Sequence, residues 1–135
     1  MRIAGADDKM KDYLTSQDEV FLEICRSIAR ALRLQIRDIS KISGGCQIFA
    51  VEEESKWRNV RKVPRMIRCL RASETVDESA VRNLHEEMKR VNVNKGMLIA
   101  SAAFSGKAYE FAESRPIALV NKEKLSRLLS VALKE

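Results

Sequence analysis

The sequence has little of several residue types on which common classes of protein depend. Its 135 residues include one histidine and three cysteines, and no CxxC pair occurs. A histidine-rich metal site, a zinc knuckle and a disulfide framework are therefore excluded. Cys25, Cys46 and Cys69 are widely spaced along the chain. This usage is typical of reduced thiols and predicts a cytoplasmic protein.

Long hydrophobic runs are also missing. The longest uncharged apolar stretch, residues 96–106, is far shorter than the roughly 20 residues that span a bilayer. The N-terminus has no basic-then-apolar signal, because Asp7 and Asp8 follow a short start. Repeats, low-complexity tracts and Gly/Ser linkers are lacking too. The sequence predicts no membrane partner, and one domain over residues 16–135 after a flexible or partly helical lead-in over residues 1–15.

The positive charge is concentrated in one short segment. The chain carries 25 basic and 19 acidic residues, for a formal net charge of +6. Residues 1–55 hold eight basic and ten acidic side chains, and residues 72–135 hold ten and nine. Residues 56–71 hold seven basic side chains and no acidic one. Like charges this dense repel unless something anionic meets them, so the segment predicts a surface for nucleic acid.

Apolar periodicity predicts alternating helices and strands. Ser16 and Thr75 each precede a glutamate by three positions, which is capping-box spacing, and Ser105 is a further predicted cap. Apolar residues recur at helical intervals in residues 16–33, 75–90, 105–115 and 125–132. Runs of β-forming residues occupy residues 34–39, 46–51, 65–71, 96–101 and 117–120. This order predicts an α/β fold in which a mixed β-sheet is flanked by helices on both faces.

Three segments of the C-terminal half carry a resemblance to a known family: Lys95–Ser101, the pair Phe104 and Ser105, and Ile117–Val120. In order and spacing, they match a glycine-led apolar strand, a Phe-Ser helix start and a second apolar strand. From about residue 19 to residue 129, the chain resembles the Mrr-type restriction endonuclease domain of the PD-(D/E)xK superfamily. The resemblance implies a restriction-endonuclease-like core.

The same resemblance implies three catalytic groups. In the family, an Asp on the second strand and a Glu or Gln on the third hold Mg²⁺, and a Lys two residues further on helps to activate water. These positions fall on Gln47, Arg68 and Leu70. Arginine stays protonated in proteins and would put a permanent cation where the metal ion would sit. We therefore expect a catalytically inactive domain with no metal and no cofactor.

Two other functions remain open from the sequence. Glu52–Glu54, in a predicted hairpin turn, are candidate displaced metal ligands of an active Mg²⁺-dependent nuclease, with Lys89 or Arg71 replacing the lysine. Alternatively, Met66 and Leu70 would share the face of Arg68 and leave it partly apolar. That face would suit a homo-oligomer or a protein partner in a larger assembly.

The predicted nucleic-acid surface combines basic side chains with one tryptophan. It consists of Lys56, Trp57, Arg58, Arg61, Lys62, Arg65, Arg68 and Arg71. Trp57 is suited to stacking on an exposed base, and Arg68 to gripping a phosphate. We expect DNA rather than RNA as the ligand. The competing interpretation is a solvated hairpin whose arginines pair with the three glutamates and whose tryptophan covers the sheet edge.

The cysteines are interpreted as packing residues. Cys25 lies beside Ile24 and Ile28 on a predicted helix and is expected to act as a small buried hydrophobic residue. Cys46 and Cys69 lie on neighbouring predicted strands and can approach each other.

Overall fold

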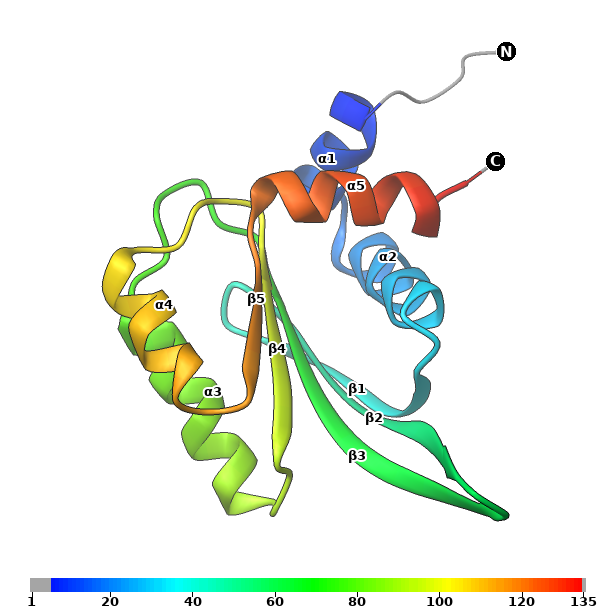
Figure 1. The fold of residues 1–135 in the computed structure, drawn as a ribbon. Helices are drawn as coiled ribbons and strands as arrows, with labels where there is room; N and C mark the ends of the chain where they lie inside the picture. The colour runs from blue at the N-terminus through cyan, green and yellow to red at the C-terminus, as the bar shows by residue number, and fades with distance from the viewer. Residues whose placement is uncertain (1–5, 135) are drawn as a thin grey trace.

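A computed structural model describes residues 6–134 and shows a sheet between two layers of helices (Figure 1). The helices are α1 (Ala6–Thr15), α2 (Asp18–Ala31), α3 (Glu78–Arg90), α4 (Gly106–Glu113) and α5 (Lys122–Ala132). The strands are β1 (Gln35–Ile42), β2 (Gly45–Lys56), β3 (Asn59–Leu70), β4 (Lys95–Ala100) and β5 (Ile117–Val120). Within these residues, no helix combines the length and the apolar character needed to cross a membrane.

The sheet is mixed, and its strands lie in the order of the sequence. β1, β2 and β3 pair antiparallel, whereas β3, β4 and β5 pair parallel. The parallel half needs crossover helices, which α3 and α4 supply. Helices α1, α2 and α5 lie on one face of the sheet, and α3 and α4 lie on the other (Figure 1). The predicted fold class is confirmed.

Each face of the sheet has its own hydrophobic core, because successive strand residues point to opposite faces. On β3, Ile67 and Cys69 pack with α1, α2 and α5, whereas Met66 packs with α3 and α4. On β4, Ile99 belongs to the first core and Leu98 to the second. The alternation fixes which face each polar residue of β2 and β3 occupies.

Two of the three predicted helix caps are wrong. α2 begins after Gln17, whose side chain makes no capping bond, rather than after Ser16. Asp77 rather than Thr75 caps α3, and its carboxylate accepts a hydrogen bond from an amide of the first turn. Ser105 caps α4 as predicted. Several Ser, Thr and Asp residues near a helix start compete for the cap, and spacing alone does not separate them.

The β2–β3 hairpin is longer than predicted. Both strands have 12 residues and pair continuously from Gly45 opposite Leu70 to Lys56 opposite Asn59. The expectation of a turn at Glu52–Glu54 is therefore wrong, because these residues lie within β2. The turn comes after Lys56, where Trp57 has a positive φ of 59°. Charged residues hide the strand pattern here, since neither face of this distal part is buried.

The described part of the N-terminal lead-in is α1, which packs against α5 and completes the first core. Tyr13 is fully buried, and its hydroxyl donates a hydrogen bond to the Leu70 carbonyl oxygen at 2.9 Å. Its ring meets that of Phe21 edge to face, with centroids 5.1 Å apart. Residues 1–5 lie outside the described residues.

Ser101 joins the end of β4 to the segment after β3. Its hydroxyl accepts a hydrogen bond from the Ala72 amide and donates one to the Ala72 carbonyl, both at 2.8 Å. Ser101→Ala leaves both backbone groups without these partners, so we expect a loss of about 2 kcal/mol in the free energy of unfolding. Urea denaturation measures the loss. The exposed Ser130→Ala serves as control, and a loss below about 0.5 kcal/mol for Ser101→Ala would contradict this role.

Candidate nucleic-acid interface and metal-ligand positions

Gln47 and Arg68 lie directly opposite each other on β2 and β3. The Arg68 Nε atom donates a hydrogen bond to the Gln47 Oε1 atom at 2.7 Å. Leu70, two residues further along β3, is half-buried on the same face. Partial burial lowers the pKa of Arg68, and the carboxylate of Glu87 acts in the opposite direction. The two side chains at the expected ligand positions are thus bonded to each other.

Glu87 of α3 is a neighbour of this pair that the sequence reasoning missed. A hydrogen bond from Arg90 is the largest cause that lowers the pKa of Glu87, and the charge of Arg68 lowers it further. In the sequence, Glu87 precedes the apolar Met88 and follows His85 and Glu86. Glu87 comes one position before Met88, a core residue of α3, so it lies at the edge of the helix face that meets the sheet. This position was the only sign in the sequence that Glu87 lies near the strands.

The acidic run Glu52–Glu54 does not gather around Gln47. Glu52 and Glu54 lie on the opposite face of the sheet, where they pair with Arg65 at 2.6 and 3.4 Å. Glu53 shares the face of Gln47, but six residues of strand separate the two by about 20 Å. The structure therefore does not bring these glutamates together with Arg68.

Arg71 and Arg65 are engaged inside the domain. The Arg71 Nη1 atom donates to the Ser16 carbonyl oxygen at 2.6 Å, and its guanidinium lies 3.9 Å from the Phe21 ring centroid. Arg71 follows the last residue of β3, and its contacts with Ser16 and Phe21 place it on the face of the first core, away from Arg68. The side chain of Arg65 is 12% exposed and is held by Glu52.

The expected apolar face around Met66 and Leu70 does not form. Met66 is only 2% exposed and packs in the core beneath α3 and α4. Leu70 packs against the same core. The helices that follow β3 cover this face, which a single strand pattern does not reveal.

The distal part of the β2–β3 hairpin projects beyond the helices (Figure 1). We call it the basic arm and define it as Lys56, Trp57, Arg58, Val60, Arg61 and Lys62, all exposed. Arg61 pairs with Glu54 at 3.5 Å, as the solvated-hairpin interpretation expects. Within residues 6–134, no ion pair involves Lys56, Arg58 or Lys62. Trp57 is fully exposed, so it does not cover the sheet edge as the solvated-hairpin interpretation requires.

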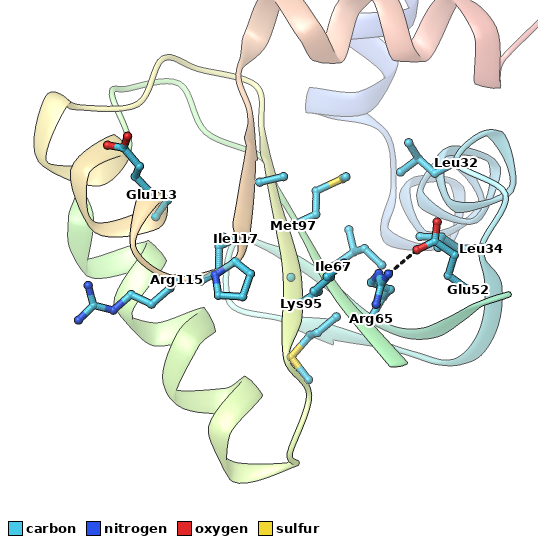
Figure 2. A pocket seen from close by; sticks show the side chains of 15 residues that line it. Leu32, Leu34, Glu52, Arg65, Ile67, Lys95, Met97, Glu113, Arg115 and Ile117 are labelled. Carbon is cyan, nitrogen blue, oxygen red and sulfur yellow. Dashed lines mark ion pairs between the residues drawn. The ribbon is translucent and has the colours of Figure 1, made fainter. Parts of the chain in front are cut away.

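A pocket of about 580 Å³ lies where β4 and β5 begin, between the end of α2 and the α4–β5 turn (Figure 2). Its wall is mainly apolar, with Leu34, Ile67 and Met97 among the lining residues. The Arg65–Glu52 ion pair lies at one side, as the dashed line in Figure 2 marks. Gln47, Arg68 and the basic arm do not line this pocket.

A family model described as a restriction endonuclease, Mrr_cat, matches residues 15–129. The chain belongs to the Mrr-type restriction endonuclease family. The solved structure of the DNA modification-dependent restriction endonuclease AspBHI is 17% identical, with a TM-score of 0.69. It matches 92% of this chain and 33% of its own. The MspJI restriction endonuclease in complex with a 27-mer oligonucleotide is 13% identical, with a TM-score of 0.59, over 96% of this chain and 35% of its own.

The Mrr-type chain thus spans about a third of the length of these two structures. At such identities, they establish the fold and nothing finer. No curated protein matches the sequence. The resemblance stated from the C-terminal segments is confirmed, together with the restriction-endonuclease-like fold.

Proposed function

We propose that this Mrr-type domain binds DNA without cleaving it. The observation that carries the proposal is the Arg68–Gln47 hydrogen bond at 2.7 Å. Mg²⁺ prefers carboxylate and other oxygen ligands, whereas Arg68 contributes a cation and Gln47 one neutral oxygen that is already accepting a hydrogen bond. Leu70 offers no proton and no charge to an attacking water. These residues do not fit a divalent metal site.

The basic arm supports the binding half of the proposal. Phosphate contacts supply most of the affinity of proteins for DNA, and Lys56, Arg58 and Lys62 are exposed cations available for them. Trp57 at the tip is fully exposed, which supports stacking on an unpaired base. One similar structure is named as DNA modification-dependent and the other contains an oligonucleotide, which favours DNA as the ligand.

Fluorescence anisotropy of a labelled duplex tests binding by the full chain. We expect saturable binding at low salt, with an affinity that falls linearly on a logarithmic plot against salt concentration. A duplex that stays unbound at low salt, up to the highest soluble protein concentration, would end the proposal. A single-stranded probe of the same sequence shows whether Trp57 favours unpaired bases.

Arg68→Ala tests whether Arg68, which stands where the family has a metal ligand, contacts a phosphate. The Nε atom is bonded to Gln47, while no bond of the terminal Arg68 nitrogens occurs within residues 6–134. We expect about tenfold weaker binding and a salt slope smaller by about 0.9. Arg127→Ala, an equal charge change on the exposed face of α5, is the control and should leave affinity nearly unchanged. Equal affinities of the two variants would remove Arg68 from the interface.

A protein-interaction role is the second candidate, because the arm also exposes Trp57 and Val60, the latter by 64%. Sedimentation velocity separates it from the first. A stable oligomer in which the fluorescence of Trp57, the only tryptophan, shifts to shorter wavelength would favour interaction. A monomer with exposed-type emission would favour DNA binding by the free arm.

A further inference from the structure

Three thiols that are far apart in the sequence meet in the first core. Cys25 lies on α2, Cys46 on β2 and Cys69 on β3, and all three are free and fully buried. Their Sγ atoms all lie within 4.8 Å of one another. Cys46 and Cys69 are directly paired across the two strands. The meeting is a product of the fold, since no short motif links the residues.

The spacing of the sulfur atoms suits a shared metal ion. Three sulfurs in one plane, each about 2.3 Å from a central ion, would be about 4.0 Å apart. The sulfur atoms lie at most 4.8 Å apart in the structure. Shifts of a few tenths of an ångström for each sulfur atom would bring them to the spacing that a shared ion needs. Thiolate sulfur is a soft ligand and selects soft ions such as Cu(I).

The half-buried guanidinium of Arg71 acts electrostatically on the thiols. A hydrogen bond with Cys46 raises the pKa of Cys25, and the charge of Arg71 acts weakly in the opposite direction. The Arg71 Nη2 atom is buried and has no hydrogen-bond partner within the described residues. Hydrogen bonds from Cys25 and then Cys69 lower the pKa of Cys46, and the charge of Arg71 lowers it further. Hydrogen bonds with the same two thiols and burial raise the pKa of Cys69, so Cys46 is the thiol that ionises most readily. An anionic metal–thiolate group would attract the Arg71 guanidinium, whose Nη2 atom has no partner within the described residues.

We propose that Cys25, Cys46 and Cys69 bind one soft monovalent ion of the Cu(I) class. Within residues 6–134, no fourth Cys, His, Asp or Glu joins the cluster, whereas structural zinc is almost always four-coordinate. Binding forms three metal–sulfur bonds, and two thiols release their protons to the buffer. Two thiolates, one thiol and one Cu(I) carry a net charge of −1, which Arg71 balances. The metal keeps its oxidation state, so no oxidant is needed.

The full chain is refolded without oxygen in the presence of one equivalent of Cu(I), because the thiols are fully buried in the folded protein. After gel filtration, we expect one copper ion per chain and three sulfur neighbours by X-ray absorption at the copper edge. Under mild denaturation, the three thiols of the copper-loaded protein should resist alkylation. The thiols of the metal-free protein should react under the same conditions. These measurements need no variant.

Cys25→Ala and Cys69→Ala are expected to weaken copper retention more than tenfold. Ile28→Val, one turn along α2 in the same core, is the matched control for loosened packing and should retain copper. Loss of all copper from the wild-type chain on gel filtration would overturn the proposal. So would coordination by fewer than three sulfurs, equally tight binding of Zn²⁺, or full retention by both cysteine variants.

Discussion

The triple variant Lys56→Ala, Arg58→Ala, Lys62→Ala is expected to bind duplex DNA about 100-fold more weakly than the wild-type chain. Each exposed cation contributes about 1 kcal/mol when it meets a phosphate, after allowance for solvent. The logarithmic salt slope should fall by about 2.7, because about 0.9 is lost with each contact. Anisotropy titrations at four or more salt concentrations measure both quantities.

A matched variant separates the contribution of the basic arm to DNA affinity from the contribution of net charge. Lys122→Ala, Lys124→Ala and Arg127→Ala together remove the same charge from the exposed face of α5, which lies far from the arm in Figure 1. We expect this variant to keep the wild-type affinity within a few fold. If both triple variants weaken binding equally, the affinity comes from the field of the whole domain and the arm has no special role.

Tyr13→Ala is expected to lower the free energy of unfolding by about 3–5 kcal/mol, the range for removing a buried aromatic side chain. Tyr13 is fully buried against Phe21, and its hydroxyl donates to the Leu70 carbonyl. Tyr13→Phe keeps the ring and loses this bond, so its cost should be only about 1 kcal/mol. Urea denaturation with a common slope measures both losses.

The Tyr13 series tests whether α1 belongs to the domain. Tyr109, which is 41% exposed, provides Tyr109→Ala as the control with a small expected loss. A loss below about 1 kcal/mol for Tyr13→Ala would mean that α1 contributes little to stability. The domain would then begin effectively at α2.

Elements with a buried face were predictable from the sequence. β4 and β5 are short apolar runs bounded by polar residues, and α3 carries Val81, Leu84 and Met88 at helical spacing, so their order and type followed from the apolar pattern. The distal half of the β2–β3 hairpin has no buried face. Its strands are held by backbone pairing and by cross-strand pairs such as Arg61–Glu54, which periodicity does not detect.

The sequence indicated which residues of the candidate site share a strand pair, but not their long-range contacts. The strand register places Gln47 opposite Arg68, so the two positions assigned from the resemblance are neighbours, and their role stays a prediction. The inward role of Arg71 depends on Ser16 and Phe21, more than 45 residues earlier in the chain, and no local pattern indicates such contacts. The cluster of the three thiols depends on long-range packing in the same way. The spacing of the cysteines in the sequence argued against a metal site, because spacing motifs detect only ligands that are close together in the chain.

Incubation of a labelled duplex with saturating protein and Mg²⁺ or Mn²⁺ tests most directly the central claim, that the domain binds DNA without cutting it. Binding and strand integrity are measured in the same samples. We predict a fully bound and intact duplex at every metal concentration. Cleavage that follows the protein through purification, requires the divalent metal and disappears in Glu87→Gln would contradict the claim, because it would show a metal site rebuilt around the carboxylate near Arg68.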